Sequence, residues 1–294
     1  MGRLGNLRNL CFIAILLTSW SIHAGDDPDV TKQRETARKL FSGDGVSRNV
    51  DQALKLFLSL AEKGDADSQA AAALILIRGD AGTKNPQEAV RWAKKSADHG
   101  NANGQFVLGR MLLIGDGIAR DPAQGAVWIE KAAAQELAPA ESDMGKLYVA
   151  GIGVRQNLES GAAWFRKAAD HGDLIAQYQF GLMAARGHGV PKDLALSEKY
   201  WLRSANQGHP RAAYELGALY GRGQGVKKNS SEALKWLEIA RKLGSGESDL
   251  MLDILAVRSQ ISAGTTSEQT TEANKLADQF TPRKESSVTQ NDLH

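Results

Sequence analysis

The sequence contains a single cysteine, Cys11, among 294 residues. This scarcity excludes an internal disulfide and a thiolate metal site. Neither charge is in excess, since 36 Lys and Arg stand against 34 Asp and Glu. That balance argues against nucleic acid as the main partner, because binding to a phosphate backbone needs a concentrated basic surface. Long polar–apolar alternation is missing as well, so strands are not expected.

Long apolar runs are also absent, and the short one that is present lies at the N-terminus. Arg3 and Arg8 precede an apolar stretch at 10–17, and a short polar segment then ends at Ala24. A membrane span needs about 20 apolar residues. The pattern therefore favours a cleaved signal peptide over residues 1–24 rather than an uncleaved anchor. Cleavage would leave a neutral, cysteine-free chain without a transmembrane segment, in the periplasm or secreted.

What the sequence does have is a step of 36 residues that runs through most of the chain. Six glycines keep the step without an insertion: Gly43, Gly79, Gly115, Gly151, Gly187 and Gly223. Large residues keep it too: Leu56, Trp92, Trp128, Trp164, Tyr200 and Trp236. A third column holds good N-cap residues: Asn49, Asn85, Asp121, Asn157, Asp193 and Asn229. Several columns at one period identify a tandem array.

Each unit is predicted to be a helical hairpin. One helix follows the cap, for example over 157–171, and a second covers 174–186 before the turn at 187–189. The glycines of that turn supply positive φ and reverse the chain. We also expect the third residue after the cap to reach back to the cap's own N–H, as in a capping box. The residues concerned are Gln52, Glu88, Gln124 and Glu232.

Small and large residues at the same step explain why the units must stack. Glycines recur in mid-helix, where each costs about 1 kcal/mol against alanine, so close helix–helix approach is expected there. These are Gly109, Gly145, Gly181 and Gly217. The tryptophan column is expected to pack against alanines of the same helix and to bury a continuous core between hairpins.

This pattern resembles the SEL-one-like repeat family, which is related to the tetratricopeptide repeats. The resemblance rests on segments such as YELGALYGRGQGV at 214–226 and MGKLYVAGIGV at 144–154, and it extends from about residue 38 to 246. It implies an all-α fold, a right-handed α-solenoid of about six 36-residue helix-turn-helix repeats with capping helices. It also implies that the first helices line a concave groove and that the protein is a scaffold or adaptor, often exported in bacteria. It does not imply a chemical activity.

The predicted organisation has five parts. They are a signal peptide at 1–24, an N-terminal capping helix at 25–42, repeats at 43–246, C-terminal capping helices at 247–281 and a disordered tail at 282–294.

Catalytic and cofactor motifs are not found. The sequence has no Ser-x-x-Lys, no Gly-x-Ser-x-Gly, no phosphate loop with a lysine and no His-Glu-x-x-His. His99 and His171 share one repeat column, but alternate units of a solenoid lie roughly 20 Å apart, given 8–10 Å between packed helices. A cation at each helix C-terminus explains them better than a metal does. No catalytic, cofactor or metal site is predicted, and the protein is not expected to be an enzyme.

The candidate site is the groove, which would bind a protein or peptide through residues that packing does not need. Gln105 and Gln177 belong to the same first-helix surface. The candidates are Arg78, Arg110, Lys146, Tyr178, Arg186, Tyr214 and Arg222. Arg and Tyr are favoured at interfaces. Alternatively, the tyrosines pack between hairpins and the arginines bind carbonyls at helix ends.

Two classes of function remain open at this point. The first is an exported protein–protein interaction scaffold that regulates an envelope sensor or an assembly system. The second is a cell-envelope hydrolase of β-lactamase-like activity, or a peptidoglycan- or glycan-binding module. The enzymatic members that the resemblance brings in are rich in disulfides, whereas the mature chain here has no cysteine. The oligomeric state stays open.

Overall fold

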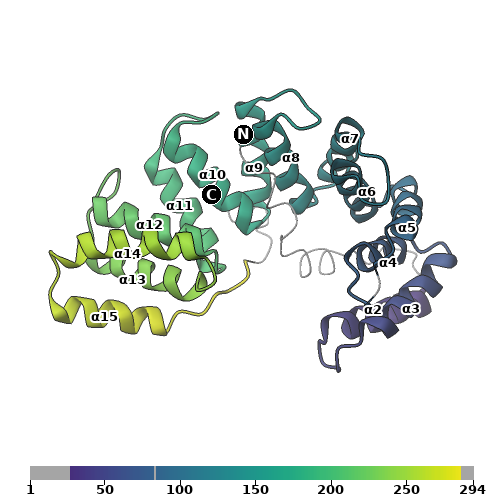
Figure 1. Cartoon of the computed structure of the whole chain (residues 1–294), viewed down its shortest axis with the longest axis horizontal. Helices are drawn as coiled ribbons and strands as arrows, with labels where there is room; N and C mark the ends of the chain where they lie inside the picture. The colour runs from purple at the N-terminus through teal and green to yellow at the C-terminus, as the bar shows by residue number, and fades with distance from the viewer. Residues whose placement is uncertain (1–26, 83, 286–294) are drawn as a thin grey trace. The chain divides into compact units, whose positions relative to one another are not determined.

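The computed structural model describes residues 27–82 and 84–285, and the regular elements in this part of the chain are all α-helices (Figure 1). The helices are α2 (Pro28–Ser42), α3 (Val50–Glu62), α4 (Ala66–Arg78), α5 (Pro86–Asp98), α6 (Ala102–Ile114), α7 (Pro122–Ala133), α8 (Ala138–Ala150), α9 (Leu158–Asp170), α10 (Leu174–Arg186), α11 (Leu194–Asn206), α12 (Pro210–Arg222), α13 (Ser230–Leu243), α14 (Ser248–Ser262) and α15 (Ser267–Asp278). The predicted signal peptide, 1–24, lies outside the described residues.

The helices pack as successive hairpins, α4 with α5, α6 with α7, and so on to α12 with α13. The all-α solenoid of 36-residue helical hairpins is thereby confirmed. The chain divides into two compact units, one with α2 to α7 and one with α8 to α15. Each unit has its own buried core, and the fully buried side chains include Phe57 and Trp92 in the first unit and Phe180 and Leu216 in the second.

Asparagine and aspartate begin the helix that follows each glycine turn, as predicted. In the hairpins of the structure this helix is the second one, and the helix before the turn is the first. In each case the side chain accepts a hydrogen bond from the backbone N–H three residues later, which satisfies one of the four free donors of a helix start. The residues are Asn49, Asn85, Asp121, Asn157, Asp193 and Asn229. The backbone N–H of each cap donates to the carbonyl nine residues earlier, as Asn85 does to Leu76 at 2.9 Å. Each cap therefore ties the two helices of its hairpin together.

The prediction of a capping box, in which the third residue after the cap binds the cap's own N–H, is wrong for these helices. Gln52, Glu88, Gln124 and Glu232 do not reach the N–H of the cap, because that N–H is already bound to the preceding helix. The carboxylates of Glu88 and Glu232 instead accept from the indole Nε1 of Trp92 at 3.4 Å and of Trp236 at 3.1 Å. A complete capping box occurs at the start of α15.

Positive φ angles lie where the glycine columns place them. Gly187 and Gly189 have φ of 72° and 74°, so a side chain at either position would be strained. Glu136, which interrupts another glycine column, adopts the same left-handed region with φ of 61°. The backbone of the repeat is thus kept even where the residue type is not.

The mid-helix glycines allow the close approach that the sequence predicts. A Cβ at Gly181 would lie 2.5 Å from Trp201, and a Cβ at Gly145 would lie 2.7 Å from Phe165. The side chain that faces these glycines is the one after the tryptophan column in the repeat. Within that column, Trp92, Tyr200 and Trp236 are buried, whereas Trp128 and Trp164 are partly exposed. The expected core of large rings is therefore interrupted in the two middle repeats.

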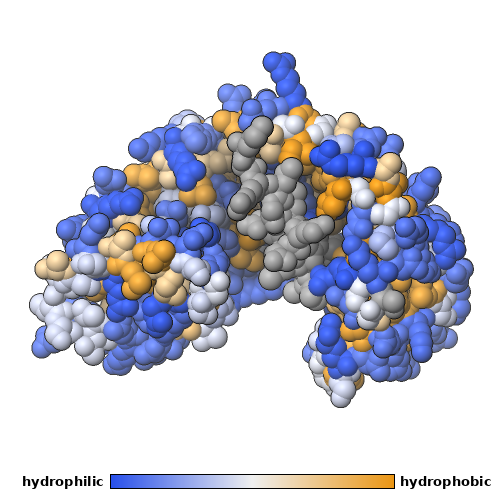
Figure 2. All heavy atoms as spheres, viewed as in Figure 1, coloured by the Kyte–Doolittle hydropathy of each residue, from blue (hydrophilic) through white to orange (hydrophobic). Residues whose placement is uncertain are grey.

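The last two helices do not form a further hairpin. α14 touches α12 and α13, while α15 packs mainly on α13. As a result, Leu252 and Leu255 on α14 are 68% and 52% exposed, and Figure 2 shows apolar atoms over α14 on a mostly hydrophilic face. Beyond α15, the tail was predicted to be disordered from residue 282. Residues 282–285 instead lie against the second unit, while 286–294 lie outside the described residues.

Candidate partner-binding site

The two candidates in the first unit have neighbours of their own. Arg78, at the end of α4, places Nε 2.8 Å from the Asp80 carboxylate. Arg110 on α6 lies with its guanidinium 5.6 Å from the centre of the Phe106 ring. Both side chains thus make intrachain contacts within the first unit.

The other five candidates lie in the second unit. On α8, Lys146 donates to Asp143 at 2.8 Å. On α10, Tyr178 stacks on the His209 ring with centroids 4.5 Å apart, and burial raises its pKa to about 12. Tyr214 on α12 is half-buried against the core, and burial raises its pKa too. The tyrosines therefore combine packing with a partly exposed ring.

Arginines gather around one carboxylate on the first helices of the last two repeats. Burial raises the pKa of Glu215, while the positive charges of Arg186, Arg222 and Arg211 oppose that shift. Arg186 and Arg222 are exposed, and they form no ion pair among the described residues. We call Tyr178, Arg186, Tyr214 and Arg222 the arginine–tyrosine cluster.

A row of polar side-chain pairs was not foreseen. In each pair, a residue near the start of a first helix meets the residue 30 positions later, at the end of the second helix. The pairs are Gln69–His99 at 3.3 Å, Gln105–Gln135 at 2.9 Å, Glu141–His171 at 2.7 Å and Gln177–Gln207 at 2.9 Å. The first two pairs lie in the first unit and the last two in the second. We call them the polar pairs.

Cations on aromatic rings accompany the polar pairs. Lys131 lies 4.1 Å from the centre of the Trp128 ring, and Lys167 lies 4.7 Å from that of Trp164. In the next repeat, the Arg203 guanidinium lies 5.4 Å from the Tyr200 ring. Such contacts hold the cation in place at the end of each second helix.

The C-terminal segment lies on the last polar pair. Glu285 accepts from Arg203 Nε at 2.9 Å and from Gln177 Nε2 at 2.5 Å. Its own N–H donates to Gln207 Oε1 at 3.3 Å, and the N–H of Arg283 donates to the carbonyl of Asn206 at 2.9 Å. Main chain and carboxylate of the segment are thus both bound.

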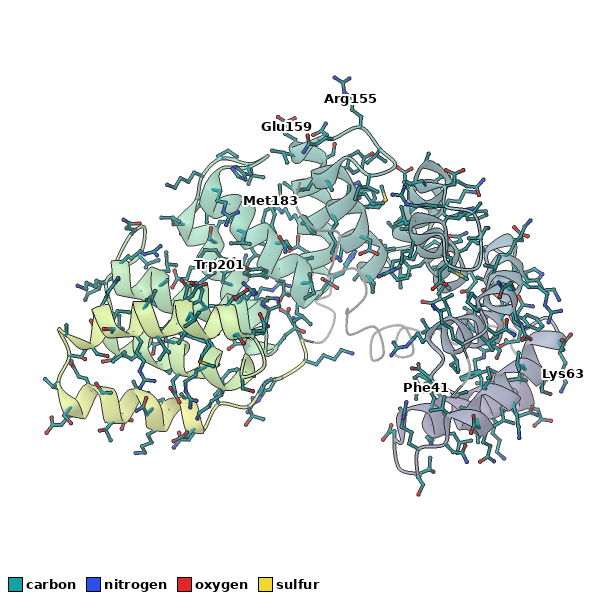
Figure 3. All side chains as sticks on the ribbon, viewed as in Figure 1. Phe41, Lys63, Arg155, Glu159, Met183 and Trp201 are labelled. Carbon is teal, nitrogen blue, oxygen red and sulfur yellow. The ribbon has the colours of Figure 1, made fainter. Side chains whose placement is uncertain are left out.

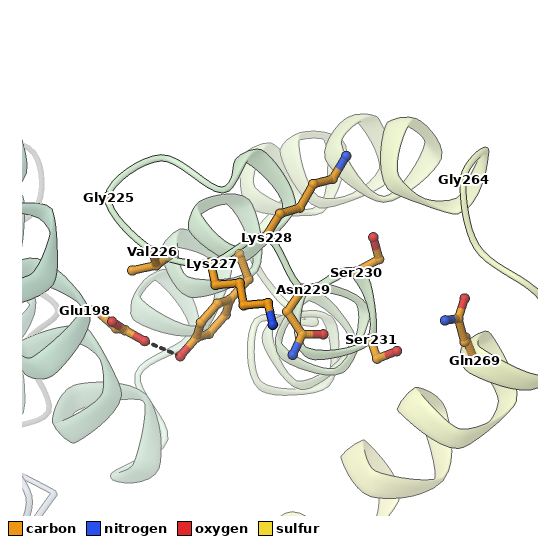
Figure 4. Close-up of a pocket in the computed structure, with 11 residues that line it drawn as sticks. Glu198, Gly225, Val226, Lys227, Lys228, Asn229, Ser230, Ser231, Gly264 and Gln269 are labelled. Carbon is orange, nitrogen blue, oxygen red and sulfur yellow. Dashed lines mark hydrogen bonds between the residues drawn. The ribbon is translucent and has the colours of Figure 1, made fainter.

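A surface depression of about 650 Å³ lies beside the start of α13 (Figure 4). It is lined by the loop 225–231, with Glu198, Tyr220 and Gln269. Tyr220 donates to Glu198 at 2.5 Å, and burial, together with this bond, raises the pKa of Tyr220. Most of the lining residues are exposed, so the depression does not enclose a small molecule.

His99 and His171 do not belong to a metal centre among the described residues. His99 and His171 each bind the facing member of a polar pair. Within residues 27–82 and 84–285, no three His, Cys, Asp or Glu side chains gather so that they could hold a metal ion. None of the described helices is long and apolar enough to cross a membrane.

Sequence reasoning named Gln105, Gln177 and the two histidines but missed their partners. The missed partners are Gln69, Gln135, Glu141 and Gln207. A search for polar residues 30 positions apart within the 36-residue step would have paired them.

Comparisons with known proteins come from a family model and from solved structures. The Sel1 repeat model matches six consecutive segments, 33–65, 66–101, 102–137, 138–173, 174–209 and 210–245. The helix predicted as an N-terminal cap is therefore counted from residue 33 as part of the first repeat. No curated protein matches the chain.

Two solved structures are similar to this chain. One is a protective antigen present in uropathogenic Escherichia coli strains, which displays an SLR fold; it is 30% identical over 85% of this chain and 53% of its own, with a TM-score of 0.74. This chain thus spans about half the length of that protein. The other is a Sel1 repeat protein from Oxalobacter formigenes, 29% identical over 83% of this chain and 98% of its own, with a TM-score of 0.68.

Proposed function

Because this chain belongs to the Sel1 repeat family, we propose that it is an exported scaffold that binds a partner protein through the first helices of its second unit. Sel1 repeat proteins commonly mediate protein–protein interaction. A repeat array suits this role, since it presents many similar helices on one extended surface.

The observation that carries the proposal is the arginine–tyrosine cluster. Arg186 and Arg222 are exposed and form no ion pair among the described residues, while Tyr178 and Tyr214 keep part of each ring at the surface. A guanidinium that is not used within the fold is available to a partner's carboxylate. Half-buried tyrosines add rigid contact area at little cost in entropy.

Charge balance favours a partner with an acidic or mixed surface. Arg211 is paired with Glu247 at 2.9 Å, whereas the guanidinium groups of Arg186 and Arg222 form no ion pair among the described residues. Such a patch speeds encounter with a negatively charged surface and orients it. We infer that the partner presents carboxylates to α10 and α12.

A pair of charge-matched variants tests the proposal. Arg186→Gln/Arg222→Gln removes two positive charges from the cluster, whereas Arg155→Gln/Lys192→Gln removes two from exposed loops of the same unit; Arg155 points into solvent (Figure 3). Crosslinking in periplasmic extract, followed by mass spectrometry, should lose its products in the first variant and keep them in the second.

Thermal unfolding completes this test. Both variants should unfold within about 2 °C of the wild type, because surface substitutions usually change stability by less than about 0.5 kcal/mol. Crosslinked products that survive in the first variant, or a large loss of stability there, would contradict the proposal.

The exported location is a separate part of the proposal, and the signal-like pattern of residues 1–24 supports it. N-terminal sequencing of the protein recovered from periplasm or medium should begin at Gly25. Recovery of a chain that keeps Met1 in the membrane fraction would contradict export by cleavage.

A further inference from the structure

The last polar pair is built as a binding site, and part of this chain is bound to it. The Gln177 side chain is fully buried, and that of Arg203 is 15% exposed. Gln177 Oε1 accepts from Gln207 Nε2 at 2.9 Å, while its Nε2 donates to Glu285 and to the carbonyl of Ala169. The fold thus holds the side-chain amides of Gln177 and Gln207 in one orientation, and Gln177 Nε2 directs an N–H at the Glu285 carboxylate.

The equivalent pair Gln105–Gln135 takes the same orientation where no described segment is bound to it. Gln135, two repeats earlier, donates to Gln105 at 2.9 Å and to the carbonyl of Gly100 at 3.0 Å. Gln207 donates to Gln177 and to the carbonyl of Gly172 at the same two distances. No described residue binds Gln135 Oε1, whereas Gln207 Oε1 accepts the N–H of Glu285. The site is therefore preformed, and preorganisation favours binding.

The site recognises two features of the segment. One is the extended main chain, since the N–H groups of residues 283 and 285 are both bound. The other is a carboxylate, which receives Arg203 and the buried Gln177. Gly208 lets the segment approach, because a Cβ there would lie 3.1 Å from Pro282 Cβ. An extended segment with a small or flat residue three positions before a glutamate fits this arrangement.

The bound segment is held by its main chain and by the Glu285 carboxylate. The side chains of residues 281–284 are exposed, and only Glu285 is partly buried. Phe280, which packs edge-on against the Trp236 ring at 6.0 Å, anchors the start of the segment to the core. Residues 281–285 can therefore leave the site while α15 stays in place.

We propose that Gln177, Arg203 and Gln207 form a receptor for an extended, glutamate-bearing segment of a partner protein, and that residues 281–285 occupy it in cis until such a segment displaces them. This inference rests on the proposed function, because it names the kind of segment that the partner presents. Charge complementarity between Arg203 and the glutamate selects a segment that carries a carboxylate at this position over one with a neutral or basic side chain there.

The covalent link between residues 281–285 and the rest of the chain sets how strongly these residues compete with a free peptide. A short flexible tether holds its ligand at an effective concentration of about 1 mM. If a free peptide has an intrinsic Kd of about 100 µM, competition from the tail would weaken its apparent affinity about tenfold. A substitution that weakens binding of the tail should therefore raise the apparent affinity of the free peptide, by up to that factor.

The test uses the mature full chain and a fluorescent peptide that copies residues 279–287, followed by anisotropy. The Glu285→Gln chain should bind the peptide about fivefold more tightly than the wild-type chain does, because a tail that is weakened about tenfold still competes about twofold at the same effective concentration. A peptide with Gln in place of its glutamate should bind the Glu285→Gln chain about tenfold more weakly, the factor for one charge-assisted hydrogen bond. This second comparison changes the peptide alone, so it does not depend on folding of a variant.

Site variants locate the binding. In the Glu285→Gln background, Arg203→Gln should weaken the peptide at least tenfold. Lys131→Gln, its counterpart two repeats earlier, should leave the affinity unchanged. Equal losses in the two variants would show general charge attraction and would overturn the proposal.

Other outcomes also overturn it. Equal affinity of the wild-type and Glu285→Gln chains would mean that the tail does not occupy the site. A concentration-dependent dimer that Glu285→Gln dissolves would assign the site to the tail of a second copy. Should the peptide fail to bind while crosslinking still depends on Arg186 and Arg222, this inference falls and the proposed function stands.

Discussion

Replacing Gly181 by alanine should destabilise the protein, although glycine to alanine in a helix ordinarily stabilises it. Gly181 lies in the middle of α10, and a Cβ there would lie 2.5 Å from both Cδ1 and Nε1 of Trp201. That indole is 3% exposed and donates to the carbonyl of Tyr178 at 3.3 Å. Figure 3 shows Trp201 among the helices of the second unit. The ring can make room only by losing its hydrogen bond and its packing.

The expected size follows from three terms. Removing the glycine gains about 1 kcal/mol of helix propensity. Overpacking a well-packed core costs about 1–3 kcal/mol, and the lost hydrogen bond costs about 1 kcal/mol. The net effect is a loss of about 1–3 kcal/mol in the free energy of unfolding, and the middle of that range lowers Tm by roughly 4–8 °C.

A double-mutant cycle with Trp201→Ala isolates the contact. Without the ring, the new methyl group meets open space, so Gly181→Ala should stabilise the Trp201→Ala protein by about 1 kcal/mol through propensity alone. Urea unfolding followed by far-UV circular dichroism measures all four proteins. A stabilising effect in the wild-type background, or the same loss in both backgrounds, would refute the reasoning.

Three further predictions concern single residues. Stability should fall by about 3 kcal/mol as pH drops from 6.5 towards 4, since burial lowers the pKa of His209 to about 4 and only the unfolded chain takes up a proton in that window. His209→Asn, which keeps a helix cap, should flatten that part of the curve in urea titrations at several pH values. Asn157→Ala should cost about 1 kcal/mol in thermal unfolding and Asn157→Asp much less, because the lost cap bond needs only a side-chain oxygen. Arg34→Gln should cost about 3–5 kcal/mol in urea unfolding, because it leaves the poorly exposed Asp65 and Asp67 carboxylates without their bidentate partner; a loss below about 1 kcal/mol would contradict this.

The helices and their ends could be predicted because each depends on local chemistry that the 36-residue step repeats. The cap at Asn157 and the helix over 174–186 lie where the sequence places them. Repetition separates such signals from chance, since a cap that recurs six times at one step is not accidental. Even the departure at Glu136 keeps the left-handed backbone of its column.

Side-chain partners could be predicted less well, because they depend on what lies across the hairpin. The carboxylate of Glu88 was expected to bind a backbone N–H, but that donor already binds the carbonyl of Leu76 across the hairpin. Likewise, Trp128 is half-exposed while Ile129, its neighbour, fills the space beside Gly109. Adjacent residues of a helix point about 100° apart around its axis. The 36-residue pattern does not show which of two adjacent residues faces the neighbouring helix.

The site for the C-terminal segment could not be read from any repeat column, because it depends on how the array ends. If α14 and α15 had continued the array as a seventh hairpin, α15 would pack on α14. It packs on α13 instead, with Ala273 and Ala277 buried and Phe280 against Trp236. That placement directs the chain back towards earlier repeats, where the polar pair at Gln207 is already formed. The repeats therefore form the receptor, Gln177, Arg203 and Gln207. The segment that binds to it, residues 281–285, comes from the part of the chain that departs from the repeat.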